Sequence, residues 1–144
     1  MDIFFSSSAS ETEKIAFDFA KTLQGNEVLA MFGTLGMGKT AFVRGLASGL
    51  GNTSEISSPT FAIVHDYGGN PHLYHFDMYR ISTWDDLYST GFFDYLDMGG
   101  VLAVEWSENI ENVLPESYIR IEFEKGNDEN QRTIKIYKPG EANT

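Results

Sequence analysis

At 144 residues, the chain has the size of one domain, and its hydrophobic content of 42% is that of a packed globular protein. We see no apolar run that would span a bilayer and no basic segment of a secretory signal at the N-terminus. The lack of cysteine excludes disulfides and thiolate metal sites, and the net charge of −11 argues against direct, high-affinity nucleic-acid binding. We expect a cytoplasmic protein with a protein partner, and self-association stays open.

The first predicted elements are a helix and a buried strand. Ser10–Glu13 has the form of a capping box. Apolar residues spaced by four, from Ile15 to Leu23, predict a helix that ends near Gly25. Glu27–Phe32 then predicts the first core strand.

The segment after this strand is the most informative motif of the chain. Gly33–Thr40 matches G-x-x-x-x-G-K-[ST] at every fixed position, and a helix is predicted from there to about Leu50. Glycines let backbone N–H groups surround a phosphate, and the helix start adds its positive dipole end. Lys39 is expected to contact the phosphates. The predicted nucleotide-binding residues of this segment are Gly33, Thr34, Leu35, Gly36, Met37, Gly38, Lys39, Thr40 and Ala41.

The same segment has an alternative interpretation. Gly36–Ala41 also fits the dinucleotide fingerprint G-x-G-x-x-[G/A], which requires an acid about 20 positions later at a strand end. Glu55 has that distance but lies in a polar, loop-like stretch, whereas Asp66 ends a predicted strand but lies further along. Lys39 and Thr40 would have no role in a dinucleotide site, so a nucleoside triphosphate is favoured.

The middle of the chain predicts a hairpin and another core strand. Phe61–Tyr67 and His72–Asp77 predict two strands joined by the turn Gly68–Pro71, so the sheet must be mixed. Ser82–Thr90 predicts a short helix, and Val101–Val104 predicts a buried strand.

The last quarter completes the predicted fold. Ser107–Val113 predicts a short helix, and Tyr118–Glu124 and Arg132–Tyr137 alternate as a half-exposed antiparallel pair should. We predict an α/β protein, a P-loop NTPase-like three-layer sandwich with a mixed central sheet that includes an antiparallel hairpin. Residues 1–137 are expected to form a single P-loop ATPase domain, and 138–144 a loose C-terminal tail.

Two acids stand where a metal site is expected. Glu105 follows the strand Val101–Val104, and Asp77 ends the strand before it. Ligands of open α/β sheets lie beyond the carboxyl ends of the strands, and Mg²⁺ takes few protein ligands. We therefore assign Glu105 and the Thr40 hydroxyl to Mg²⁺, and Asp77 to metal-bound or attacking water.

Further candidates each have a plainer alternative. Thr60 stands where a γ-phosphate sensor would, or makes a simple turn into a strand. Arg80 would stabilise transition-state charge, or form a salt bridge. Trp106 would stack on a ligand or partner, or fill the core. His65 and His75 lack metal-site spacing and are predicted to lie on sheet faces.

Together these motifs resemble the TsaE (YjeE) family over about residues 3–137. The matching segments are Gly33–Thr40, Val43–Leu46, Ser58–Phe61, His75–Arg80, Gly91 and Glu105–Glu108. The resemblance implies a small bacterial P-loop ATPase that is needed to make N6-threonylcarbamoyladenosine in tRNA. It also implies ATP and Mg²⁺ as cofactors, slow hydrolysis by the protein alone, and TsaD and TsaB as partners.

The resemblance also implies roles for particular residues. Residues around Ala9 to Thr12 would approach the adenine. The chain departs from the family at Thr34, where an acid is usual, so no role is carried over to that position. The remaining implied functional positions are Lys39, Thr40, Thr60, Asp77, Glu105 and Trp106.

Three hypotheses on function stay open. The first is a partner-controlled ATPase, and the second is a small-molecule kinase, for which the chain offers few arginines to build a lid. The third is a nucleotide-gated binding module in which hydrolysis is incidental. A GTPase is disfavoured because the sequence lacks an N-K-x-D segment.

Overall fold

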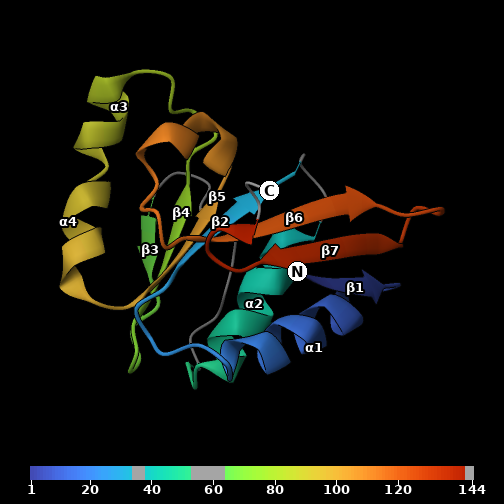
Figure 1. The fold of residues 1–144 in the computed structure, drawn as a ribbon. Coiled ribbons are helices and arrows are strands. Elements are labelled where there is room, and N and C mark those ends of the chain that lie inside the picture. Colours follow the sequence, from blue (N-terminus) through green and yellow to red (C-terminus); the bar gives the residue numbers. More distant parts are fainter. Residues whose placement is uncertain (34–37, 53–63, 142–144) are drawn as a thin grey trace.

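The computed structural model describes residues 1–33, 38–52 and 64–141. In this part of the chain, helices cover both faces of a twisted sheet (Figure 1). The strands are β1 (Asp2–Ser6), β2 (Val28–Phe32), β3 (Val64–Asp66), β4 (Leu73–Asp77), β5 (Val101–Glu105), β6 (Ile119–Lys125) and β7 (Arg132–Tyr137). The helices are α1 (Ala9–Ala20), α2 (Lys39–Gly49), α3 (Trp84–Ser89) and α4 (Phe92–Met98), with 3₁₀ turns η1 (Ser107–Asn109) and η2 (Glu111–Val113).

The sheet is mixed, as the sequence predicts. Its strand order is β1-β7-β6-β2-β5-β4-β3. The four strands β6, β2, β5 and β4 run parallel, while β3 pairs with β4, β7 with β6 and β1 with β7 in antiparallel fashion. The predicted hairpin is confirmed by the register Val64↔Phe76 and Asp66↔Tyr74.

Two hydrophobic cores lie on opposite faces of the sheet. One holds Phe42 and Leu46 of α2 against side chains of β2, β5, β6 and β7. The other holds Leu87 of α3 and Phe92 of α4 against the opposite face of β4 and β5. All five residues of β2 and of β5 are buried, because helices cover these central parallel strands on both sides. The layers are therefore helix, sheet and helix, which confirms the predicted fold class.

Close approach of α1 to α2 fixes the helix that follows the phosphate-loop motif. A Cβ atom added at Gly45 would stand 2.2 Å from the carbonyl oxygen of Glu13 and 2.7 Å from Cβ of Ala16. At Gly49 it would stand 2.6 Å from the carbonyl oxygen of Phe17. Glycine at these two positions lets the helix backbones come into contact, so α2 has a firm support along its length.

The ends of several elements differ from the sequence-based predictions. Helix α1 begins at Ala9, because the Ser8 hydroxyl rather than that of Ser10 accepts the Glu11 N–H at 3.1 Å. It ends at Ala20, and the chain reaches the next strand through a turn. The predicted helix at 107–113 is instead the two 3₁₀ turns η1 and η2. Residues 61–63 of the second predicted strand, Phe61–Tyr67, lie outside the described residues.

Two elements were missed. The sequence of strand β1 shows no alternation of polar and apolar residues, since Ile3, Phe4 and Phe5 are all apolar. In the structure Phe4 packs against the core, while Ile3 and Phe5 are exposed on the opposite face. The strand exists because β7 offers a pairing edge, with Phe4 opposite Ile134. Helix α4 exists because Tyr95 and Phe92 pack their rings edge-on against the Phe76 ring. Both elements depend on partners distant in sequence.

The chain ends described by the structure lie close to each other. The Met1 ammonium pairs with the Glu141 carboxylate at 2.6 Å, and Glu141 also accepts the backbone N–H of Lys138. None of the helices in the described ranges combines the length and the apolar character that a membrane span needs.

Candidate phosphate and metal site

The site lies at the carboxyl edge of the parallel strands. β2 ends at Phe32, immediately before Gly33, and the neighbouring strands β4 and β5 end in acids. The register Asp77↔Glu105 places these two acids side by side, on the sheet face that α2 covers. Ligands of open α/β sheets bind at this edge, so the predicted residues converge where chemistry is expected.

The glycines at both ends of the motif have conformations that favour glycine. Gly33 has φ 137°, and a Cβ there would stand 2.9 Å from the carbonyl oxygen of Phe123. Gly38 has φ 90°, in the left-handed region, and directly precedes α2. The predicted residues Thr34, Leu35, Gly36 and Met37 lie outside the described residues.

Helix α2 begins differently from α1 and α3. Gly38 supplies no side-chain cap, and the first turn of α2 carries no acid. By contrast, Ser8 caps α1, and Thr83 caps α3 in a capping box with Asp86. A helix start without a side-chain cap, next to a glycine backbone, is suited to an anion such as phosphate. Thr40 and Ala41 are the second and third residues of this helix.

Lys39 is a buried cation among carboxylates. Its side chain donates to the carbonyl oxygen of Gly33, and the residue is only 5% exposed. Burial lowers its pKa, while the nearby carboxylates Glu108, Glu105 and Asp77 act in the opposite direction. Because these three carboxylates face a single ammonium, the cluster carries an excess of negative charge that a divalent cation would offset.

The two acids at the strand ends are held differently. Asp77 accepts the backbone N–H of Tyr79 at 2.9 Å, and burial raises the pKa of its carboxyl group. Glu105 is 8% exposed and lies 2.5 Å from Nε2 of His75. A hydrogen bond fixes the backbone directly after Asp77, since the Asn109 amide donates to the Met78 carbonyl at 2.8 Å.

The residues present fit a metal that relies on its nucleotide. Among the described residues, no group of three or more His, Asp or Glu side chains could hold a metal ion by itself. Mg²⁺ usually takes one or two carboxylates and completes its shell with phosphate oxygens and water. Glu105 and the Thr40 hydroxyl therefore remain the candidates on this chain, together with bound phosphates.

Trp106 has a strained backbone and lies against the predicted phosphate-binding lysine. Its φ of 60° is the only positive value among the described non-glycine residues. The indole ring lies 4.6 Å from the Lys39 ammonium and 5.0 Å from the Tyr79 ring. Left-handed backbone in a bulky residue costs free energy and is often found at functional sites. The residue also packs against the second core, which agrees with the core alternative, while stacking on a ligand or partner stays a prediction.

The remaining predicted site residues have different surroundings. Thr12 is buried, and its methyl group lies 3.9 Å from where a Cβ at Gly38 would stand, so α1 approaches the motif. Ala9 is exposed at the start of α1. Arg80 is exposed and has no ion pair with another residue in the described ranges. Thr60 lies outside the described residues.

Sequence reasoning missed two residues of this site. The Glu108 carboxylate, from η1, accepts the backbone N–H of Gly33 at 3.0 Å. His75 lies on a sheet face, as predicted, but it also pairs with Glu105. A signal existed for the histidine: it stands two residues before Asp77, and alternation along β4 directs both side chains to one face.

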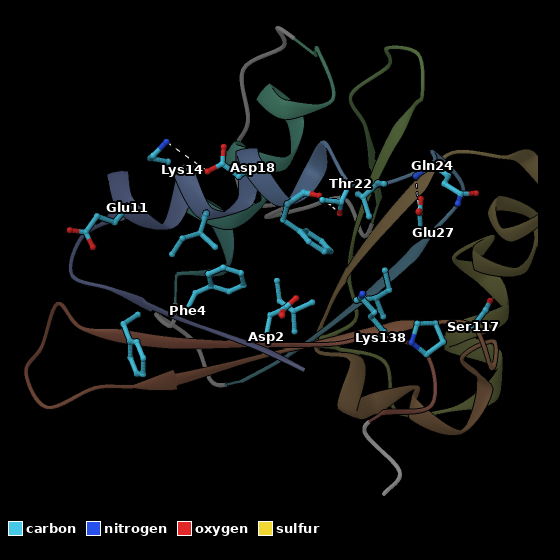
Figure 2. Close-up of a pocket in the computed structure, with 17 residues that line it drawn as sticks. Asp2, Phe4, Glu11, Lys14, Asp18, Thr22, Gln24, Glu27, Ser117 and Lys138 are labelled. Carbon is cyan, nitrogen blue, oxygen red and sulfur yellow. Dashed lines mark hydrogen bonds and ion pairs between the residues drawn. The ribbon is translucent and has the colours of Figure 1, made fainter.

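A separate groove lies on the other side of α1. It has a volume of about 1000 Å³ and is lined by α1, β1, the ends of β6 and β7, and the segment at Lys138 (Figure 2). Its lining includes the apolar side chains of Phe4 and Ile15 and the acidic side chains of Glu11 and Asp18. Of the segment Ala9–Thr12, which is predicted to approach the adenine, Glu11 lines this groove. Lys39, Asp77 and Glu105 do not line it, so the groove is distinct from the candidate phosphate site.

The sheet order, the uncapped α2 and the paired acids define the class of protein. They describe an α/β protein of the P-loop nucleotide-binding class, with its site at the end of β2. A solved structure shares this fold with a TM-score of 0.77. That structure is the crystal structure of Bacillus subtilis YdiB, which is 33% identical, and the match covers 96% of this chain and 86% of that one.

Sequence comparisons give the family. The model of the family "Threonylcarbamoyl adenosine biosynthesis protein TsaE" matches residues 6–134. The TsaE proteins of Bacillus subtilis and Aquifex aeolicus are 40% and 39% identical to this chain. The alignments cover 86% and 91% of this chain, and 78% and 92% of the two relatives. The chain belongs to the TsaE family.

Proposed function

We propose that this protein binds ATP with Mg²⁺ and hydrolyses it slowly, as an accessory protein of N6-threonylcarbamoyladenosine modification of tRNA. The related proteins are named for this pathway. The observation that carries the proposal is the buried Lys39 ammonium, which lies beside an uncapped helix start and three carboxylates. We further propose that the site belongs to one domain, 1–137, and that the protein works in the cytoplasm.

Each described residue has a distinct part in this proposal. The Lys39 ammonium and the N-terminus of α2 bind the phosphates. Asp77 would orient water, and the Glu105 carboxylate and Thr40 hydroxyl would hold the metal, which would neutralise phosphate charge when bound. Trp106 lies over Lys39 and limits water at the ammonium. Ala9 and Thr12 border the adenine.

Control by partners is part of the proposal. Arg80 is the candidate cation on this chain for transition-state charge, and it is exposed rather than fixed by an ion pair with a described residue. An arginine supplied by another protein can accelerate phosphoryl transfer by about 10³–10⁵-fold. We therefore propose that TsaD and TsaB raise the turnover of this protein.

The test is nucleotide turnover with and without purified TsaD and TsaB. We expect slow Mg²⁺-dependent release of phosphate by the protein alone and a clear rise with the partners. Equal turnover in both conditions would refute partner control. If a non-hydrolysable ATP analogue fully supports tRNA modification, the protein is a nucleotide-gated binding module instead. A phosphorylated small molecule detected by mass spectrometry would favour a kinase.

A further inference from the structure

A fully buried histidine supports one of the two strand-end acids. His75, in the middle of β4, is 0% exposed, and its Nε2 lies 2.5 Å from Oε2 of Glu105. The register pairs His75 with Ala103, two residues before Glu105, so the two side chains lie on one face of neighbouring strands. The contact is therefore built by two rigid central strands, not by a loop.

The chemistry of the two groups assigns the donor. An ionised carboxylate only accepts hydrogen bonds, so the His75 ring donates its Nε2–H to Glu105. The other ring nitrogen, Nδ1, is buried and has no hydrogen-bond partner among the described residues. The carboxylate is thus the single hydrogen-bond partner that the described structure gives this ring. A buried polar atom without a partner costs free energy, which simple packing by an apolar side chain would avoid.

The bond constrains how Glu105 can meet a ligand. It occupies one carboxylate oxygen and leaves the second for a cation or its water. Carboxylates that hold metals are commonly oriented by such outer hydrogen bonds, and losing one typically costs about 10–100-fold in metal affinity. Phenyl or aliphatic replacements of the ring would leave the buried Glu105 carboxylate without this donor.

We infer that His75 is a positioning residue, which holds the Glu105 carboxylate in the orientation required for the nucleotide-bound Mg²⁺. The inference rests on the proposed function, since it assumes that Glu105 serves the metal. It concerns only the metal-dependent part of nucleotide binding. The phosphate contacts of Lys39 and of α2 should be independent of the ring.

The test measures calorimetric affinity for a non-hydrolysable ATP analogue, with excess Mg²⁺ and with EDTA. The dissociation constant in EDTA divided by the dissociation constant with Mg²⁺ isolates the contribution of the metal. For His75→Phe we expect this ratio to fall by about 10–100-fold, with the affinity in EDTA unchanged. For His75→Gln, whose amide can donate from nearly the same position, we expect most of the ratio to return. His72→Phe, at an exposed histidine near the start of β4, is the matched control.

Three further variants keep the result interpretable. Glu105→Gln should show the same loss, and adding His75→Phe to it should produce little further change, because both act on one interaction. His75→Leu, a smaller side chain without a donor, replaces His75→Phe if the larger ring prevents folding. Unfolding temperatures without nucleotide report whether each variant is folded.

The outcomes separate the inference from the function on which it rests. If the wild-type protein shows no gain in affinity with Mg²⁺, the proposed function fails. If the wild type shows this gain and His75→Phe or His75→Leu keeps it, the positioning role is wrong. An equal loss in His75→Gln and His75→Phe would also overturn it, since the ring would then matter only for packing.

Discussion

The α1–α2 layer and the carboxyl edge of the strands differ in the kinds of groups that they bury. In the layer, apolar side chains and glycine contacts bring two helices together, and α1 has its side-chain cap. At the edge, the Lys39 ammonium and the Asp77 carboxyl are desolvated, Trp106 has a left-handed backbone, and α2 has no side-chain cap. The layer therefore supplies stability, whereas the edge holds groups at a cost in free energy, a pattern common at functional sites.

The largest effect is expected at Lys39. Lys39→Ala removes charge-assisted contacts to phosphate, each worth about 1.5–3 kcal/mol, so ATP affinity should fall by about 10–100-fold. Calorimetric titration with ATP measures this loss. Lys14→Ala, at an exposed lysine of α1, is the control and should bind like the wild type. Unchanged affinity in Lys39→Ala would show that the edge does not bind phosphate through this ammonium.

The contrasting substitution lies in the layer. Gly45→Ala places a Cβ against the Glu13 backbone and Ala16, and the helices must separate, which should cost about 1–3 kcal/mol of unfolding free energy. Chemical denaturation measures the cost, with Ser48→Ala on the exposed side of α2 as the control. ATP affinity of the folded fraction should hold. If Gly45→Ala instead lost ATP affinity without losing stability, the division between the two regions would be wrong.

Substitution of Asp77 tests whether the groups at the carboxyl edge lower the stability of the fold. Burial raises the pKa of this carboxyl in the folded protein, so the ionised form is disfavoured by folding at neutral pH. Asp77→Asn should therefore unfold at a higher temperature than the wild type at pH 7, and the gain should vanish as pH falls through the raised pKa toward the ordinary value. Hydrolysis should be lost. Thermal unfolding from pH 7 to pH 4 checks the sign, and a gain that grows with falling pH would contradict it.

The smallest effect is expected at Glu108. Its carboxylate accepts the Gly33 N–H and faces Lys39, so it occupies groups that a phosphate would use. Glu108→Gln removes this negative charge and should tighten ATP binding by about 2–10-fold, the range of one modest hydrogen bond. Competition with a fluorescent ATP analogue can resolve such a change, and weaker binding would mean that Glu108 supports the phosphate site. Glu111→Gln, in the neighbouring turn η2, is the control.

Local signals explain how much of the fold could be predicted. The strand before Gly33, the helix after it and the hairpin before Asp77 were each correct in kind, because their apolar periods and turn residues lie within short windows. Strand β1 and helix α4 escaped prediction. Their partners, β7 and the aromatic side chains of β4, are distant in the chain, and no local pattern encodes such a contact.

The candidate site divides in the same way. The spacing of Gly33, Gly38 and Lys39 by itself predicts a phosphate-binding backbone, because the motif is contiguous and each residue acts through its own chemistry. Only the tertiary structure could place Glu108 on the Gly33 N–H and His75 on Glu105. These contacts span 75 and 30 positions of the chain. The parallel register of β4 and β5, which no residue encodes alone, decides that His75 meets Glu105.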